Sequence, residues 1–304
     1  MKGAFKDTSP WIQLLILVVL CILGADLMYI LACLFVMLQA FIDGTDIDQM
    51  VIAMQTVPVY MREVQFFVAL GSFVFPALFS GYLFSDNYKT YLKLNTPVRV
   101  NVLLMTFVCS LVAIPAINFT TMLNQEMVLP EWMSGVEQWM KAAEEAVAKA
   151  TEKILYAENI GALLMNILVV AILAGVGEEL IFRGALLNII GRIFRNPHVV
   201  IWIVAIIFSA VHMQFYGFLP RMLLGAYLGY LFYFTNNIWV PILAHFTNNA
   251  FVVVGYYLYQ DEPKSISEQL DTFGYGDTWW AALASLALVL LLLAQIKKAG
   301  SKIP

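Results

Sequence analysis

The sequence has little charge. Of its 304 residues only 12% are Asp, Glu, Lys or Arg, whereas 61% are hydrophobic. Soluble domains carry about a quarter charged residues and about half apolar ones, so the composition excludes an ordinary soluble domain. No basic stripe or nucleic-acid-binding motif is present, and the net charge of -4 identifies no partner. The composition therefore predicts an integral membrane protein that does not bind nucleic acid.

Reactive and metal-binding residues are scarce as well. The three cysteines, Cys21, Cys33 and Cys109, lie inside apolar runs and form neither a disulfide framework nor a Cys-x-x-Cys metal site. The sequence has no His-Glu-x-x-His motif and no Gly-x-Ser-x-Gly motif, which excludes a zincin helix and a nucleophile elbow. There are only three histidines. Any hydrolytic site must therefore be built from a small set of residues.

Long hydrophobic runs fill most of the chain. A bilayer is crossed by about 20 apolar residues, so the runs predict an all-α bundle of about eight transmembrane helices. The expected spans are 11–38, 64–84, 102–118, 159–182, 198–214, 219–234, 238–257 and 278–295. The first run is much longer than the apolar core of a signal peptide and is interpreted as a retained helix. The fifth run is short, so a buried or tilted helix is the alternative there.

The loop charges predict the topology. Basic residues gather in the N-terminal segment, in the 85–99 and 192–198 connections and in the C-terminal tail, whereas acidic residues gather in the other long connections. The positive-inside rule then places both termini in the cytoplasm, and the pattern fits a bacterial inner membrane. We expect one integrated membrane domain. Residues 1–158 supply three spans and an extracytoplasmic helix, and residues 159–304 supply the catalytic core with its motifs at 177–249 and the C-terminal helix.

The extracytoplasmic helix is predicted over residues 130–157. Trp132, Trp139, Val147 and Ile154 belong to a set of apolar residues that recur at helical spacing, and charged residues fill the opposite face. Two interpretations remain open. The helix is either a connector lying on lipid headgroups or an element that admits substrate or covers the site.

The fourth span contains three ionisable residues close together. Such side chains are costly in lipid unless they are paired, hydrated or facing the bundle interior, and they are functional candidates for that reason. Glu179 and Arg183 are four residues apart and share a helix face, so they can form an ion pair. Glu178 points about 100° away from Glu179. The arrangement suits a general base beside a buried, orienting neighbour. A purely structural Glu–Arg bridge is the alternative.

Two histidines lie in other apolar runs. His212 follows Phe208 by four residues in the fifth span, and His245 precedes Asn249 by four residues in the seventh. A spacing of four puts the imidazole of His245 and the carboxamide of Asn249 on one helix face. The third histidine, His198, follows a proline in a turn and is predicted to be a surface residue.

These groups allow two chemistries. Glu178, His212 and His245 could ligate a divalent metal, most naturally zinc, which leaves a position open for water. Without metal, Glu178 would take a proton from water while His and Asn side chains stabilise the oxyanion. Either route hydrolyses a peptide bond, and the spacing does not choose between them. Asp26, in the first span, is not included in the site.

The motifs EExxxR, FxxxH and HxxxN, in this order on separate membrane helices, resemble those of the CPBP family of CAAX proteases and bacteriocin-processing enzymes, related to the type II CAAX prenyl endopeptidases. The resemblance covers about Gly161 to Tyr257. It implies an intramembrane protease in which Glu178 activates water and Glu179 supports it with Arg183. The implied roles of the remaining motif residues are metal binding or carbonyl polarisation for His212 and His245, oxyanion assistance for Asn249 and cavity shaping for Phe208.

The resemblance leaves the substrate and the metal open. The family is usually labelled a metalloprotease family, although a glutamate-dependent mechanism is also argued for it. Its eukaryotic members cleave prenylated C-terminal tails, and prokaryotic members are associated with peptide maturation, bacteriocin self-immunity (Abi) and secretion. We therefore expect a membrane-associated peptide or protein as substrate. Two other functions compete with this one: a non-catalytic peptide-binding or bacteriocin-immunity protein, and an ion or metal transporter.

Overall fold

The computed structural model describes residues 2–44, 47–261 and 273–300, and in these ranges the chain forms helices and no strands. The chain divides into two compact units. One consists of Met1–Thr96 and Lys153–Arg195, and the other of Pro97–Glu152 and Asn196–Pro304. Charged residues of the 262–272 connection and of the last four positions, which the topology prediction uses, lie outside the described residues. The predicted division at residue 158 and the predicted topology stay predictions.

Several helices are long and apolar enough to cross a membrane. They are Pro10–Ile42, Pro58–Phe84, Val100–Gln125, Ile160–Gly191 and Gly276–Gly300, and the shorter apolar helix Pro197–Ala210 accompanies them. These helices confirm the predicted all-α membrane bundle. The other two predicted spans are also helical, but the total of eight membrane crossings stays a prediction.

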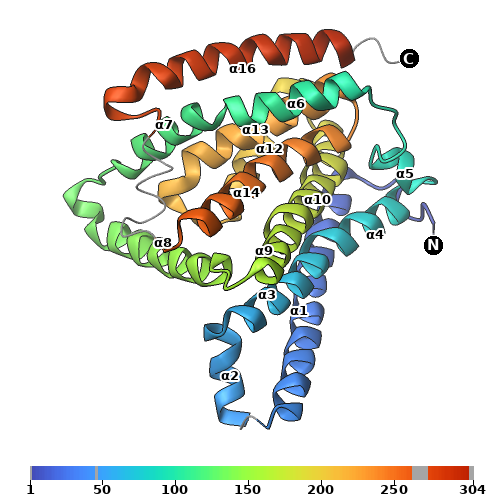
Figure 1. Ribbon diagram of the computed structural model, residues 1–304. Helices are drawn as coiled ribbons and strands as arrows, with labels where there is room; N and C mark the ends of the chain where they lie inside the picture. Colours follow the sequence, from blue (N-terminus) through green and yellow to red (C-terminus); the bar gives the residue numbers. More distant parts are fainter. Residues whose placement is uncertain (1, 45–46, 262–272, 301–304) are drawn as a thin grey trace. The chain divides into compact units, whose positions relative to one another are not determined.

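The first unit is built around the long helices near the N-terminus. Its helices are α1 (Pro10–Ile42), α2 (Ile47–Thr56), α3 (Pro58–Ala69), α4 (Phe75–Phe84), α5 (Tyr88–Tyr91), α9 (Ile160–Asn166), α10 (Ala174–Glu179) and α11 (Leu187–Gly191). Helix α1 starts after Ser9, whose side chain accepts a hydrogen bond from the Ile12 amide, as an N-cap does. It packs against α3 and α4 (Figure 1). The short helices α2 and α5 were not predicted.

Helices α9, α10 and α11 form one continuous helix from Ile160 to Gly191. Two π-helical segments, Ile167–Leu173 and Leu180–Leu186, lie on either side of α10. Segments of this kind are rare and occur frequently at functional sites. The predicted fourth span, 159–182, is therefore confirmed as a helix and continues further toward Gly191 than the sequence pattern indicated.

The second unit is a bundle with its own core. Its helices are α6 (Val100–Val112), α7 (Ile114–Gln125), α8 (Ser134–Leu155, in this unit as far as Glu152), α12 (Pro197–Ala210), α13 (Phe218–Thr235), α14 (Trp239–Tyr259) and α16 (Trp279–Gly300). Buried side chains such as Cys109, Leu228, Val240 and Ile296 form the core. Helix α16 runs along α6 and α7 (Figure 1).

Helix α12 corrects one prediction. The fifth span was expected to reach residue 214, with His212 inside it, but α12 ends at Ala210. Met213 has a φ of 53°, a left-handed conformation that commonly follows a helix C-terminus and stops its propagation. A 3-10 turn, Phe215–Gly217, then leads into α13. His212 therefore lies in a turn between two helices rather than within a helix.

Candidate active site

The two adjacent carboxylates lie at the end of α10, and Arg183 follows in the next π-helical segment. The predicted ion pair is present: Nη1 of Arg183 lies 2.8 Å from Oε1 of Glu179, and both side chains are 0% exposed. Glu178 is 9% exposed. A charged pair sealed from water is retained only where its partners are well placed, because each ion loses its hydration on burial. Glu179 is thus paired with Arg183, and of the two carboxylates Glu178 is the less deeply buried.

Glycines set the close packing around these carboxylates. A Cβ atom at Gly177 would lie 2.8 Å from the Cβ of Phe73, and one at Gly184 would lie 2.9 Å from Cδ2 of Leu92. Both distances are too short for carbon atoms. A side chain at position 177 would therefore clash with the Cβ of Phe73, and one at position 184 would require the Leu92 methyl to move. The carboxylate segment is therefore held against the residues around Phe73 and Leu92 of its own unit.

The aromatic ring of Phe208 lies beside both motif histidines. Its centroid is 5.1 Å from that of His212 and 6.0 Å from that of His245. Nδ1 of His212 lies 2.7 Å from the backbone carbonyl oxygen of Phe208. Because a carbonyl oxygen only accepts, Nδ1 must carry the proton in this contact. In a neutral His212 the other ring nitrogen, Nε2, then offers its lone pair.

His245 and Asn249 lie on α14, four residues apart and hence on the same side of that helix. His245 is buried, with 3% of its surface exposed. The side-chain amide of Asn248 donates to Oδ1 of Asn249 over 3.3 Å. The second unit thus brings together Phe208, His212 and His245, and it carries Asn249 on the helix that holds His245.

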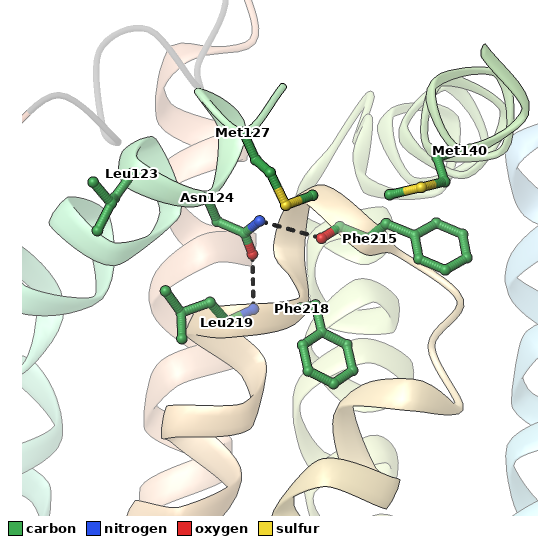
Figure 2. A pocket seen from close by; sticks show the side chains of 7 residues that line it. All are labelled: Leu123, Asn124, Met127, Met140, Phe215, Phe218 and Leu219. Carbon is green, nitrogen blue, oxygen red and sulfur yellow. Dashed lines mark hydrogen bonds between the residues drawn. The ribbon is translucent and has the colours of Figure 1, made fainter. Parts of the chain in front are cut away.

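The turn after His212 is held by side chains from distant parts of the sequence. The carboxamide of Asn124, on α7, donates to the Phe215 carbonyl over 3.3 Å and accepts from the Leu219 amide over 2.7 Å (Figure 2). A carboxylate oxygen of Glu144, on α8, accepts from the Tyr216 amide over 3.2 Å. These contacts give partners to the Tyr216 and Leu219 amides, and they give the Phe215 carbonyl a second donor besides the Phe218 amide.

Such support is needed because α12 is short. Its 14 residues rise about 21 Å, whereas the hydrocarbon core of a bilayer is about 30 Å thick. Non-helical backbone at membrane depth is tolerated only where protein or an aqueous cavity surrounds it. Helix α8 supplies part of this surrounding, and its Trp139 ring lies 5.2 Å from that of Phe215. The predicted amphipathic helix is confirmed as a helix, and its role stays a prediction.

The remaining candidates lie elsewhere. The predicted surface position of His198 is confirmed: its side chain is exposed and its Nδ1 lies 3.0 Å from the hydroxyl oxygen of Tyr230. Asp26 is exposed on α1. The carboxylates at Glu178 and Glu179 belong to the first unit and the histidines His212 and His245 to the second.

The division into two units also bears on which side chains could bind a metal together. Among the described residues, no group of three or more His, Cys, Asp or Glu side chains could hold a metal ion. The second unit contributes two imidazoles near Phe208, and a catalytic zinc site uses three protein ligands. These residues alone therefore do not make up a zinc site.

Sequence reasoning missed a buried cation in the first unit. Arg62 is 3% exposed, and its Nε donates to Oδ1 of Asn166 over 2.8 Å and to the Ile154 carbonyl over 3.1 Å. The amide of Asn166 also donates to the Leu155 carbonyl over 2.8 Å. The second predicted span began at residue 64, which left Arg62 in a loop. A span starting at Pro58, as observed, would have marked it as an intramembrane ionisable residue.

Comparison with known proteins identifies the segment that carries the motifs. Residues 160–251 match the family model described as "Type II CAAX prenyl endopeptidase Rce1-like". The chain is also similar to "Uncharacterized protein YpbD" of Bacillus subtilis (strain 168), with 28% identity over 89 residues, 28% of this chain and 42% of that protein. The chain thus spans less than half the length of this relative. No solved structure matches.

Proposed function

We propose that this chain, which carries an Rce1-like domain over residues 160–251, is an integral membrane endopeptidase that cleaves a membrane-associated peptide or protein. The observation that supports this most is the environment of the two carboxylates. Glu179 is paired with Arg183 and is 0% exposed. Its neighbour Glu178, in the matched segment, is also buried but is 9% exposed. Two chemically identical residues in different environments are what a general base and its supporting partner require.

In the proposed reaction Glu178 acts as the general base. It takes a proton from a water molecule as the water oxygen attacks the carbonyl carbon of the scissile peptide bond. The same proton then passes to the leaving amine as the carbon–nitrogen bond breaks, which returns Glu178 to its ionised form. Arg183 neutralises Glu179, so that the negative charge of Glu179 does not act on Glu178.

His212, His245 and Asn249 would stabilise the negative charge that develops on the carbonyl oxygen. Two protonation states of His212 lead to different roles. With Nδ1–H donating to the Phe208 carbonyl, a neutral ring has an unprotonated Nε2, whereas in a protonated ring Nε2 also carries a hydrogen that can be donated to the oxyanion. The metal-free form of the proposal therefore requires a donor from His245, Asn249 or protonated His212.

The metal-assisted form takes His212, His245 and Glu178 as ligands of a divalent ion, zinc by the nature of these donors, and it requires three side chains that the described residues do not show gathered in one group. An unprotonated Nε2 on His212 suits that role. The ion would polarise the carbonyl and lower the pKa of a bound water. The metal-assisted and the metal-free form use the same residues. The metal content of the purified protein distinguishes them: the metal-assisted form predicts a bound metal that a His212→Ala His245→Ala variant loses.

The proposed setting is a bacterial inner membrane with both termini in the cytoplasm, in accordance with the loop charges. The substrate would meet the enzyme within or at the surface of the bilayer. A prenylated tail, a bacteriocin precursor and a secreted protein precursor are all compatible with this location.

The function is tested by comparing cells that make the wild-type protein with cells that make Glu178→Gln at matched abundance. Terminal-peptide mass spectrometry of membranes and medium reads new N- and C-termini. Glu145→Gln, on the exposed surface of α8, is the control. We expect defined termini that vanish with Glu178→Gln and persist with Glu145→Gln. Identical termini in all three strains, together with a protective phenotype that survives Glu178→Gln, would favour the peptide-binding function.

A further inference from the structure

A pocket of about 400 Å³ opens beside the turn that follows His212 (Figure 2). All of its lining residues belong to the second unit. They are Leu123, Asn124 and Met127 from the end of α7 and the residues after it, Met140 from α8, and Phe215, Phe218 and Leu219 from the turn and the start of α13. The volume falls within the range of pockets that bind small molecules, about 300–1,000 Å³.

The pocket offers apolar contacts almost exclusively. Asn124 is its only polar side chain, and the carboxamide already donates to the Phe215 carbonyl and accepts from the Leu219 amide. A polar occupant would lose its water without gaining partners, which is unfavourable. Met127 and Met140 add flexible, polarisable walls that adapt to different apolar shapes. The lining therefore selects for a large apolar group.

The pocket lies close to a residue of the proposed site. Phe215 follows His212 by three residues, so their Cα atoms are within about 11 Å of each other whatever the path of the turn. In an extended peptide, a residue two or three positions from the scissile bond lies at a similar distance from that bond. Chain connectivity alone thus places this pocket within reach of a substrate whose carbonyl contacts His212.

The neighbourhood of the pocket indicates where its occupant comes from. On α8, Trp132 is 82% and Trp139 is 54% exposed, and the same helix carries solvated ion pairs, including Lys149 with Glu145. Exposed tryptophans beside charged residues are typical of the membrane–water interface. An occupant that reaches the pocket past α8 comes from the membrane surface, which favours a segment at that surface over the middle of an acyl chain.

We propose that this pocket binds a large apolar side chain of the peptide substrate close to the scissile bond, and so determines which bond is cleaved. The proposal rests on the proposed endopeptidase function and deepens it. Met140 and Phe218 are the specificity-determining residues, since both line the pocket and they come from different elements, α8 and the start of α13 (Figure 2). Asn124 also lines the pocket, and its carboxamide fixes the turn.

The test changes the volume of the pocket and reads the side chains around the cleaved bonds. Met140→Trp narrows the pocket and Phe218→Ala widens it. Terminal-peptide mass spectrometry on cells making each variant gives the residue preference at every position flanking the cut. We expect the wild type to prefer large apolar residues at one position. Met140→Trp should shift that preference toward small residues and Phe218→Ala toward larger ones, each by about tenfold or more.

Leu286→Trp is the matched control, since it adds the same side chain to a different apolar hollow, between α7, α13 and α16. It should leave the preference unchanged. The proposal is overturned if both pocket variants cleave with the wild-type preference, or if Met140→Trp displaces a co-purifying phospholipid without altering that preference. If even cells making the wild-type protein show no new peptide termini, the endopeptidase function itself is contradicted, and the pocket then has no peptide substrate to bind.

Discussion

The carboxylate pair and the histidine turn are held in place in different ways. Glu179 and Arg183 are four residues apart on one helix and bind each other at 2.8 Å with no exposed surface. His212 lies outside any helix, and the turn after it is bonded to Asn124, 91 and 95 residues away from its partners, and to Glu144, 72 residues away. One group is positioned by local helix geometry and the other by long-range contacts.

This difference indicates how the two groups respond to change. A buried ion pair fails when one partner is removed, because the other charge is left without solvent or counterion. A turn bonded at several points loosens in steps, because each lost hydrogen bond leaves the others in place. The carboxylate pair should therefore respond abruptly to substitution and the histidine turn gradually.

The largest effect is expected from Arg183→Met. It leaves Glu179 charged and buried, which should destabilise the protein by about 3–5 kcal/mol. Thermal unfolding in detergent measures the loss. Lys149→Met, which removes another i,i+4 pair at 2.6 Å between two exposed side chains of α8, should produce no measurable change. Combining Arg183→Met with Glu179→Gln should recover most of the stability, and a double variant as unstable as the single one would speak against a charge effect.

A smaller effect is expected from Asn124→Leu. It removes the acceptor of the Leu219 amide and the donor to the Phe215 carbonyl, which should cost about 1–3 kcal/mol. Hydrogen exchange at the Leu219 amide should become faster while amides in α1 keep their rates. Asn124→Asp retains the acceptor and should protect Leu219 better than leucine does. Equal exchange in the wild type and Asn124→Leu would show that the turn is held by other contacts.

The smallest effect is expected at Glu144. Glu144→Ala removes one of the bonds to the turn, the acceptor for the Tyr216 amide, at a cost of about 0.5–1.5 kcal/mol. Glu144→Gln keeps an oxygen in the same place and should behave like the wild type. Exchange at the Tyr216 amide distinguishes the two variants. If Glu144→Gln and Glu144→Ala accelerate exchange at the Tyr216 amide equally, the charge of Glu144 protects this amide rather than its acceptor oxygen.

The same contrast explains how much could be predicted from the sequence. The membrane helices follow from apolar runs, and the Glu179–Arg183 pair follows from its i,i+4 spacing, since both are local properties. The end of α12 at Ala210 was missed because the apolar run continues past it, and the left-handed Met213 gives no compositional signal. Asn124 and Glu144 looked like ordinary loop or surface residues. Only the folded chain brings them to the His212 turn.

The central claim is that Glu178 and the histidines act as one hydrolytic site. Its most direct test is the cleavage rate of the purified protein, on a substrate identified from its termini, for Glu178→Gln, His245→Ala and the double variant. Residues that act together in one step are strongly non-additive. We predict that the double variant is no slower than the slower single variant. Rate losses that multiply, or a Glu178→Gln variant as fast as the wild type, would contradict a shared site.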